Sequence, residues 1–331
     1  MERVAVSDQY GRTIMWKYLA AAAALGFLAA PAQAEDVTVA VTAIVEHPAL
    51  DAARDGIKAG LADAGFKEGD NLTFLYETAQ GNPATAAQIA RKYVGDAPTV
   101  IVPISTPSAQ AVVAATKDIP VVFTAVTDPV GAELVTDAQK PGGNVTGVSD
   151  LSPLGDHLAL IKEITPDVKT IGVIFNPGEA NSVSLIEKLK EMAGPAGYEV
   201  VEASATKTAD VQQAARSLVG KVDAIYVPTD NTIVSALEAA VKVAEENQIP
   251  LYAGDTDSVP RGAIAAIGFN YYDIGMQTAE IVAEVLNGKN PGDIPVTQAQ
   301  GTNLIVNPGA AEKMGVTIPE AVVKRANTVV E

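Results

Sequence analysis

The sequence predicts an α/β protein made of two doubly wound lobes that several strands join as a hinge. Three observations lead to this prediction: short apolar strands alternate with amphipathic helices, the same order of elements occurs twice, and a further helix and strand follow the second copy. Such alternation is typical of a parallel sheet covered by helices on both faces. The chain has 331 residues, of which 48% are hydrophobic, so it is long enough for two domains with cores of their own.

The N-terminal stretch reads as an export signal. Lys17 precedes the apolar run YLAAAAALGFLAA, which is too short to span a bilayer comfortably, and small residues follow at Ala32 and Ala34. We predict a signal peptide over residues 1–34, with cleavage after Ala34. The stretch before Met15 contains acidic residues, which is unusual for such a signal, so Met15 is the expected initiator.

An internal repeat predicts the order of the elements. Residues 99–135 and 223–264 both run strand, proline, polar turn, helix, Ile-Pro, strand and Thr-Asp turn. The stretches upstream of each also match, so each half is expected to run β-α-β-α-β-α-β. The first helix then places four apolar residues on one face, Leu50, Ala53, Ile57 and Leu61.

The two copies are separated by GVSDLSPLGDHL, near residue 150. After the second copy come a helical stretch, YYDIGMQTAEIVAEVLNG, and a strand, NLIVN. We expect this tail to return to the first lobe and then to cross again. The predicted N-terminal lobe is residues 35–149 and 272–302, and the predicted C-terminal lobe is residues 150–271 and 303–331.

Composition argues against several classes of function. The formal net charge is -17 and no basic stretch is visible, so we expect no nucleic-acid partner. The chain has no cysteine, which excludes disulfides and thiolate chemistry. It also lacks GxGxxG after the first strand, a P-loop and a G-x-S-x-G elbow. We predict no catalytic residue, metal or cofactor, and we interpret His47 and His157 as structural or surface residues.

Polar side chains collect where the predicted strands end. PTDNT, at residues 228–232, places four small polar residues between a buried strand and a helix, although a helix cap needs one. Ligands of parallel sheets bind at this edge. An N-cap role is the competing interpretation for Ser105, Thr106, Ser108 and Asn231. Six such turns are expected there: 42–48, 104–108, 124–129, 176–182, 228–232 and 254–258.

These turns suit a zwitterion. Helix N-termini attract a carboxylate, and acidic side chains bind an ammonium group. We expect Asp255 to hold the ammonium, with help from Asp128 or Glu46. The turns contain no lysine or arginine apart from Arg261 just beyond one of them, so the side chain of the ligand is expected to be neutral. An amino acid is the smallest common molecule that fits this description.

Long motifs resemble those of a known family. IVEHPALDAARDG, FTAVTDPVGA, PGGNVTGVSD, VPTDNTIVSALE and YYDIGMQTA resemble the tryptophan/tyrosine-type substrate-binding proteins of ABC transporters, which are type I periplasmic binding proteins, and the resemblance covers roughly residues 36–325. It implies two Rossmann-like lobes joined by three crossing strands, and capture of an aromatic amino acid for a membrane permease. The candidate ligand-binding residues that it implies are Thr42, Glu46, Ser105, Thr106, Thr124, Asp128, Asn176, Thr229, Asn231, Asp255 and Tyr271.

The predicted ligand is therefore phenylalanine, tyrosine or tryptophan, bound by a free periplasmic monomer without a lipid-anchor cysteine. A branched-chain amino acid, a sugar or a nucleobase is the alternative ligand, and an exported α/β hydrolase is the alternative class. A transcription regulator of the same two-lobed fold is not expected, because a signal peptide replaces the DNA-binding headpiece. The stacking wall for an aromatic ligand is expected from Phe123, Phe175, Tyr226, Phe269 and Tyr271.

Overall fold

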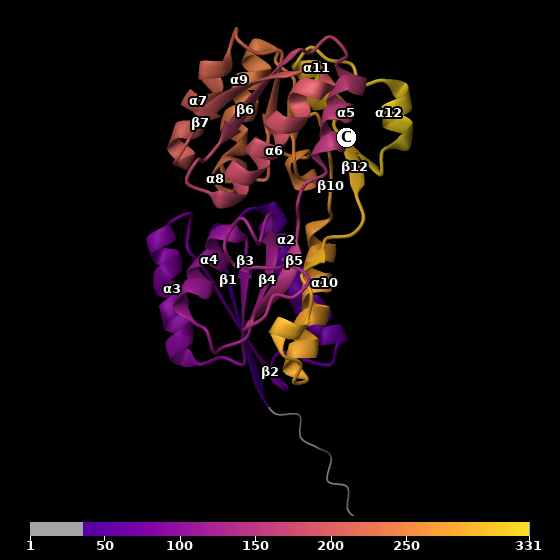
Figure 1. The fold of residues 1–331 in the computed structure, drawn as a ribbon. Helices are drawn as coiled ribbons and strands as arrows, with labels where there is room; N and C mark the ends of the chain where they lie inside the picture. Colours follow the sequence, from indigo (N-terminus) through magenta and orange to yellow (C-terminus); the bar gives the residue numbers. More distant parts are fainter. Residues whose placement is uncertain (1–35, 331) are drawn as a thin grey trace, which may run out of the picture. The chain divides into compact units, whose positions relative to one another are not determined.

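The computed structural model describes residues 36–330, so the predicted signal peptide, its cleavage after Ala34 and the Met15 start lie outside the described residues. The described chain forms two α/β lobes, each with its own sheet and its own apolar core. Figure 1 shows the elements of the N-terminal lobe in the lower part of the view and those of the C-terminal lobe above them.

The N-terminal lobe has a six-stranded parallel sheet in the order β11-β5-β4-β3-β1-β2. Its central strands are buried throughout, which fits a sheet covered on both faces. The strands are β1 (Val37–Ala43), β2 (Leu72–Thr78), β3 (Val100–Ile104), β4 (Val121–Val126), β5 (Val145–Ser149) and β11 (Thr297–Gln298). The helices are α2 (Pro48–Asp63), α3 (Pro83–Asp96), α4 (Thr106–Ala115), α10 (Tyr271–Leu286) and the short η3 (Pro291–Asp293).

The C-terminal lobe has a seven-stranded sheet in the order β13-β12-β10-β9-β8-β6-β7, in which β12 runs antiparallel to β10. The strands are β6 (Thr170–Phe175), β7 (Glu199–Ser204), β8 (Ala224–Val227), β9 (Leu251–Ala253), β10 (Ala265–Gly268), β12 (Asn303–Val306) and β13 (Thr328–Val329). The helices are α5 (Leu154–Ile164), α6 (Ala180–Ala196), η1 (Thr208–Asp210), α7 (Val211–Leu218), α8 (Asn231–Ser235), α9 (Leu237–Asn247), η2 (Thr256–Ser258), α11 (Pro308–Lys313) and α12 (Glu320–Arg325).

The chain crosses between the lobes after β5, after β10 and after β11. The tail helix α10 lies in the first lobe, and β12 and β13 add the last two strands to the second sheet. The predicted fold class, two doubly wound lobes joined by several strands, is confirmed. The predicted limits of the lobes, 35–149 with 272–302 and 150–271 with 303–331, stay a prediction.

Helix α10 belongs to the N-terminal lobe because it packs closely against α2. A Cβ atom on Gly56 would lie 2.1 Å from the carbonyl oxygen of Tyr272, and one on Gly275 would lie 2.1 Å from the carbonyl oxygen of Ala53. Glycine at these two positions therefore permits the contact. The contact places Tyr272, in the first turn of α10, beside Gly56 in the middle of α2.

One predicted helix is divided in the structure. The sequence after β8 predicts a single helix, but α8 ends at Ser235 and α9 begins at Leu237. The residue between them, Ala236, has φ -125° and ψ 29°, outside the helical region. The short helix α8 begins after Asp230, whose side chain accepts a hydrogen bond from the N–H of Ile233 at 2.9 Å.

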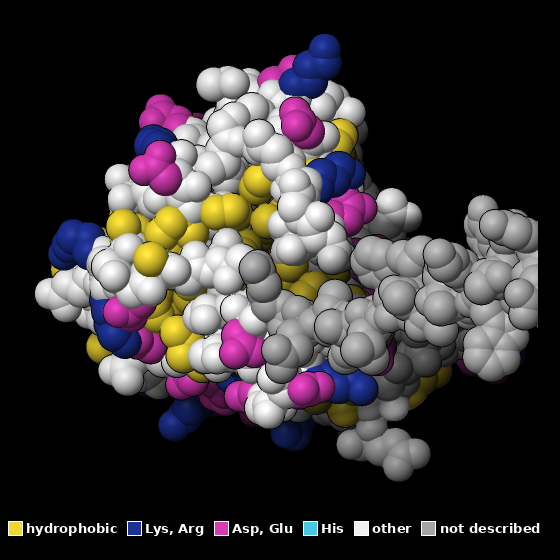
Figure 2. Space-filling view, turned by 90° about the horizontal axis from the view of Figure 1, so that it is seen from below, with side chains coloured by type: hydrophobic (Ala, Val, Ile, Leu, Met, Phe, Trp, Pro, Cys, Tyr) yellow, Lys and Arg dark blue, Asp and Glu magenta, His cyan; other side chains and the backbone are white. Residues whose placement is uncertain are grey.

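The surface carries charges of both signs. On the face in Figure 2, the described acidic and basic side chains are scattered singly, with apolar side chains between them and no cluster of lysine and arginine among the described residues. Twelve ion pairs are found within residues 36–330, many of them between exposed partners. Within the same range, no helix has both the length and the hydrophobicity that crossing a membrane would require.

Candidate functional site

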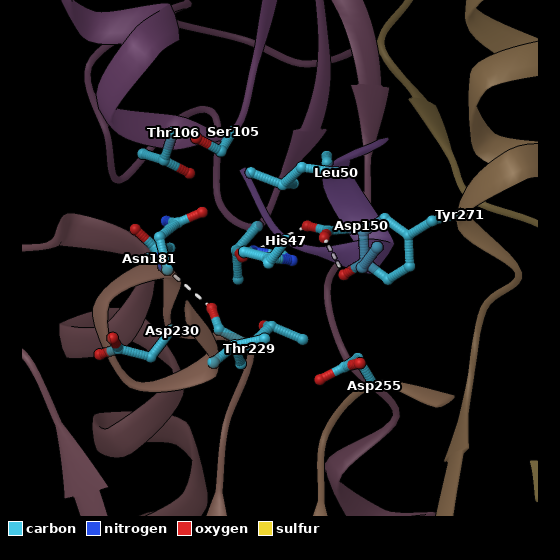
Figure 3. Close-up of a pocket in the computed structure, with 15 residues that line it drawn as sticks. His47, Leu50, Ser105, Thr106, Asp150, Asn181, Thr229, Asp230, Asp255 and Tyr271 are labelled. Atoms are coloured by element: carbon cyan, nitrogen blue, oxygen red, sulfur yellow. Dashed lines mark hydrogen bonds between the residues drawn. The ribbon is translucent and has the colours of Figure 1, made fainter. Parts of the chain in front are cut away.

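A cavity lies between the two lobes (Figure 3). The N-terminal lobe contributes His47, Ala49, Leu50, Ser105, Thr106, Ala125 and Thr127. The C-terminal lobe contributes Asn181, Thr229, Asp230, Asn231, Val234 and Asp255. Asp150, from the first crossing segment, and Tyr271, at the start of α10, complete the lining.

Ser105 and Thr106 lie where β3 ends and α4 begins. Ser105 has a φ of 76°, a left-handed value that costs a residue other than glycine about 1–3 kcal/mol and that is often found at functional sites. Both hydroxyl groups are buried and have no hydrogen-bond partner. The first N–H groups of α4 also have no acceptor within the helix. This wall therefore offers hydrogen-bond donors to an anion.

Asn181 and Thr229 form part of the opposite wall. The side-chain amide nitrogen of Asn181 donates to the carbonyl oxygen of Thr229 at 3.0 Å, which fixes the orientation of the amide. The amide oxygen of Asn181 and the hydroxyl of Thr229 then have no partner although both atoms are buried. Both can pair with a bound molecule.

The PTDNT turn serves mainly an internal network. The carboxylate of Glu179 accepts hydrogen bonds from the backbone N–H groups of Asn231 and Thr232, at 3.1 and 3.0 Å, and from their side chains, at 2.6 and 2.7 Å. Asp230 accepts from the N–H of Asn176 and from the hydroxyl of Ser182, each at 2.6 Å. Burial and the nearby Glu179 carboxylate raise the pKa of Asp230. These hydrogen bonds hold the PTDNT turn by contacts within the C-terminal lobe itself.

Asp255 is the residue of the C-terminal lobe whose carboxyl group points into the cavity. Ser258 donates to it through both its N–H, at 2.8 Å, and its hydroxyl, at 2.6 Å. Burial raises the pKa of Asp255. In Figure 3 its carboxyl group points toward the middle of the cavity, whereas that of Asp230 points away. A carboxylate accepts about four hydrogen bonds, so Asp255 can accept more from a ligand.

Asp150 lies in the first crossing segment and links it to α10 by a hydrogen bond. The Tyr271 hydroxyl donates to Asp150 at 2.8 Å, and the Thr127 hydroxyl donates to it at 3.2 Å. Burial raises the pKa of Asp150, against the effect of these two hydrogen bonds. Within the described residues, neither lysine nor arginine lines the cavity. Its carboxyl groups therefore favour a ligand that carries a positive charge.

His47 also lines the cavity, although the sequence interpretation placed it in a structural or surface role. It stands directly before α2 and is 9% exposed, and its Nδ1 atom is buried without a partner. Leu50, from the first turn of α2, lies beside it in the lining. The imidazole thus faces the same space as the unpaired hydroxyl groups.

The structure brings six of the eleven predicted ligand-binding residues to the cavity: Ser105, Thr106, Thr229, Asn231, Asp255 and Tyr271. The other five, Thr42, Glu46, Thr124, Asp128 and Asn176, lie outside its lining.

Those five residues have other surroundings. Glu46 is exposed, and Thr42 is buried on β1. The hydroxyl groups of Thr124 and Thr278 form a hydrogen bond of 2.7 Å inside the N-terminal lobe. The side-chain amide of Asn176 donates to the Thr232 hydroxyl at 2.8 Å.

Asp128 makes a contact between the lobes instead. It accepts from the Ser184 hydroxyl at 2.9 Å and pairs with the Lys188 ammonium at 3.3 Å, and both partners lie on α6. We call this contact the interlobe latch. Burial alone would raise the pKa of Asp128, but the Gly131 N–H, the Ser184 hydroxyl and Lys188 outweigh it and hold that pKa below its usual value.

The expected aromatic wall is reduced to a single residue, because Tyr271 alone of the five candidates lines the cavity. Phe123 is fully buried in the N-terminal core. The Tyr226 hydroxyl forms a hydrogen bond of 2.7 Å with Nδ1 of His157, inside the C-terminal lobe. The apolar part of the lining comes mostly from smaller side chains: Ala49, Leu50, Ala125 and Val234.

Three comparisons with known proteins show which proteins this chain resembles. The family model described as ABC transporter substrate binding protein matches residues 38–330. A protein named tyrosine-binding protein, from Clostridioides difficile (strain R20291), is 47% identical over 269 residues, which are 81% of this chain and 78% of that protein.

Two solved structures differ in their likeness to this chain. An ABC domain from Streptococcus pneumoniae in complex with L-Trp has a TM-score of 0.87 at 37% identity, with 89% of this chain and 100% of that chain covered. The ligand-free, open structure of a substrate-binding protein from Clostridium difficile has a TM-score of 0.68 at 42% identity, with 89% and 99% covered. The less identical structure is the better match, so the described lobes are arranged more like those of the L-Trp complex than like those of the open structure.

Proposed function

This chain belongs to the family of ABC transporter substrate-binding proteins, and we propose that it captures an aromatic L-amino acid in the cavity between its lobes and delivers it to the permease of an ABC importer. One observation carries the proposal: five buried polar groups without partners, from His47, Ser105, Thr106, Asn181 and Thr229, surround one cavity. Buried polar groups are nearly always paired, so this cluster is explained by a ligand that pairs with them.

The α-carboxylate of the ligand binds at the start of α4. The hydroxyl groups of Ser105 and Thr106 donate to it, and the free N–H groups of the helix add a partial positive charge. Because no lysine or arginine lines the cavity among the described residues, these neutral donors carry the recognition of the carboxylate.

The ammonium group of the ligand pairs with the acidic lining. Asp255 is our choice, because its carboxyl group points into the cavity and its two hydrogen bonds both come from Ser258. The free amide oxygen of Asn181 is a further acceptor. A positive ligand group beside Asp255 offsets the cost of burying this carboxylate.

The aromatic side chain is supported by the relatives and by the lining. The printed names of two relatives refer to tyrosine and L-Trp. The apolar residues Leu50, Ala125 and Val234, together with the ring of Tyr271, provide a surface for a neutral ring.

We infer that binding is the whole activity of the site. The hydroxyl groups of Ser105 and Thr106 have no hydrogen bond to a base among the described residues, whereas a nucleophile in catalysis needs one. The protein is proposed to work in the periplasm as a monomer after removal of its signal peptide. Its cycle consists of ligand capture, closure of the lobes and docking on the permease.

Calorimetric titration of ligand-stripped protein with each of the twenty common amino acids tests the proposal. We expect one or more of tyrosine, tryptophan and phenylalanine to bind most tightly and to raise the melting temperature, because a ligand of the folded state stabilises that state. Tighter binding of leucine or valine would overturn the aromatic assignment alone. Binding of a sugar or a purine, with no binding of any amino acid, would overturn the amino-acid site as well.

A further inference from the structure

The two histidines of the chain differ in how their ring nitrogens are used. His157 is buried and both of its nitrogens are paired, Nδ1 with the Tyr226 hydroxyl at 2.7 Å and Nε2 with the Ile267 carbonyl oxygen at 2.6 Å. His47 is also more than nine-tenths buried, yet its Nδ1 has no partner. The histidine that lines the cavity is therefore the one that still has an open position.

The imidazole of His47 is neutral at physiological pH. Burial, and to a smaller extent the charge of Arg261, lower the pKa of His47 to about 3. Arg261 is itself paired with Glu238, at 2.7 and 2.9 Å. In a neutral imidazole one ring nitrogen donates and the other accepts. Such a group can pair with a polar hydrogen of the ligand without requiring a charged partner.

We propose that Nδ1 of His47 accepts a hydrogen bond from the ring of the bound amino acid, and so selects tyrosine and tryptophan against phenylalanine. This inference rests on the proposed function. Tyrosine carries a phenolic O–H and tryptophan an indole N–H, whereas the ring of phenylalanine has no polar hydrogen. The three ligands share their α-carboxylate and ammonium groups, so His47 is a specificity-determining residue and the rest of the lining serves all three.

The position of His47 explains why it contacts the ring of the ligand and not its carboxylate or its ammonium group. In Figure 3 it lies between the side of the cavity with Ser105 and Thr106 and the side with Asp150 and Tyr271. Leu50, which lies beside His47 and lines the cavity with it, belongs to the apolar surface assigned to the ring of the ligand, so that ring passes next to His47.

The selectivity follows from the cost of an unpaired buried group. With tyrosine or tryptophan bound, Nδ1 gains the partner that it lacks. With phenylalanine bound, Nδ1 stays buried and unpaired in a site from which the ligand has displaced water. Sites built to hydrogen-bond a polar group of the substrate reject analogues without that group for this reason.

The test compares three probes, L-tyrosine, L-tryptophan and L-phenylalanine, on ligand-stripped protein by calorimetry. The wild type is expected to bind tyrosine or tryptophan at least roughly ten-fold more tightly than phenylalanine. His47→Leu removes the acceptor and should weaken that ligand toward the affinity of phenylalanine, with little change for phenylalanine itself. His47→Asn places an amide group near the position of Nδ1 and should keep part of the preference.

Asp63→Asn is the control, since Asp63 is exposed at the far end of α2 and outside the cavity lining, and it should leave all three affinities unchanged. Equal affinity of the wild type for all three probes would overturn the role of His47, and so would an equal loss for all three in His47→Leu. Absence of binding of all three probes would instead contradict the proposed function. If His47→Leu fails to fold, the wild-type preference and its retention in His47→Asn still decide the question.

Discussion

Both walls of the cavity bury polar side chains, but they differ in whether these side chains are paired within the protein. On the N-terminal wall, His47, Ser105 and Thr106 have polar atoms with no partner in the protein. On the C-terminal wall, the carboxylates of Asp230 and Asp255 are each held by several donors of their own lobe. The N-terminal wall therefore depends on a ligand for these hydrogen bonds. The C-terminal wall pairs its carboxylates internally and leaves only the amide oxygen of Asn181 and the hydroxyl of Thr229 without a partner. Substitutions that break the internal network should cost stability, whereas substitutions of groups that can still pair with a ligand should cost affinity.

The largest effect is expected from Glu179→Ala on the C-terminal side. It leaves the backbone N–H groups of Asn231 and Thr232 without their acceptor. At about 1–3 kcal/mol for each unsatisfied buried group, the free energy of unfolding should fall by roughly 2–6 kcal/mol. Chemical denaturation without ligand measures this loss. Glu187→Ala, at an exposed position of α6, the helix that begins directly after Glu179, is the control. A loss no larger than that of the control would show that the network does not stabilise the lobe.

Asp255→Asn should separate affinity from stability on the same wall. An amide oxygen can still accept from Ser258, so the fold should be kept. The charge-assisted bond to the ligand ammonium is lost, at about 1.5–3 kcal/mol, or roughly 10–150-fold in Kd. Calorimetry with the best-binding aromatic amino acid measures the change. Asp257→Asn, at a neighbouring acid outside the cavity lining, should bind normally. Unchanged affinity of Asp255→Asn would remove Asp255 from the ammonium site.

Ser105→Ala tests the N-terminal wall. The Ser105 hydroxyl has no partner in the protein, so its removal should leave the free energy of unfolding unchanged or slightly higher. Affinity for the amino acid should fall by about 0.5–1.5 kcal/mol, the usual contribution of a neutral hydrogen bond. Denaturation and calorimetry on the same sample check both parts. A variant that loses stability but keeps its affinity would contradict the assigned difference between the walls.

The smallest effect is expected at the interlobe latch. Asp128→Asn removes the ion pair with Lys188 and weakens the closed arrangement, so Kd should rise by an amount equivalent to about 0.2–1 kcal/mol. The rise should shrink at high salt, because the partners are partly exposed. In the wild type the latch is complete at neutral pH, and it is lost as the pH falls through the lowered pKa of Asp128, below the usual 3.8. A salt-independent effect would indicate that Asp128 acts in another way.

The repeat was sufficient to predict the fold, because alternating strands and helices leave few arrangements of a parallel sheet. It also predicted the edge at which Ser105, Thr106 and Thr229 lie. It could not predict where each turn residue points. Glu46 and Asp128 stand in two of these turns, yet one is exposed and the other contacts α6. That difference depends on how the second lobe sits against the first, which no local pattern encodes.

The aromatic residues show the same limit. Phe123 lies on β4, inside the sheet, and successive strand residues point to opposite faces, so its ring packs in the core and not at the strand end. His47 was assigned a structural or surface role because the sequence showed no partner for it. In the structure, the unpaired Nδ1 is the observation that connects it to a ligand. Absence of a nucleophile pattern argues against catalysis, but it says nothing about binding.

The close contact between α2 and α10 also constrains how the protein is made. Helix α2 is synthesised early, but the helix that covers it begins at Tyr271, after most of the other lobe has been made. The second sheet likewise lacks two of its strands until β12 and β13, close to the end of the chain, have been made. A nascent chain that has reached residue 150 therefore still exposes the apolar face that α10 will cover. Neither lobe can therefore complete its packing until the last third of the chain is present, because residues 271–286 cover the first lobe and residues 303–329 supply the last two strands of the second sheet.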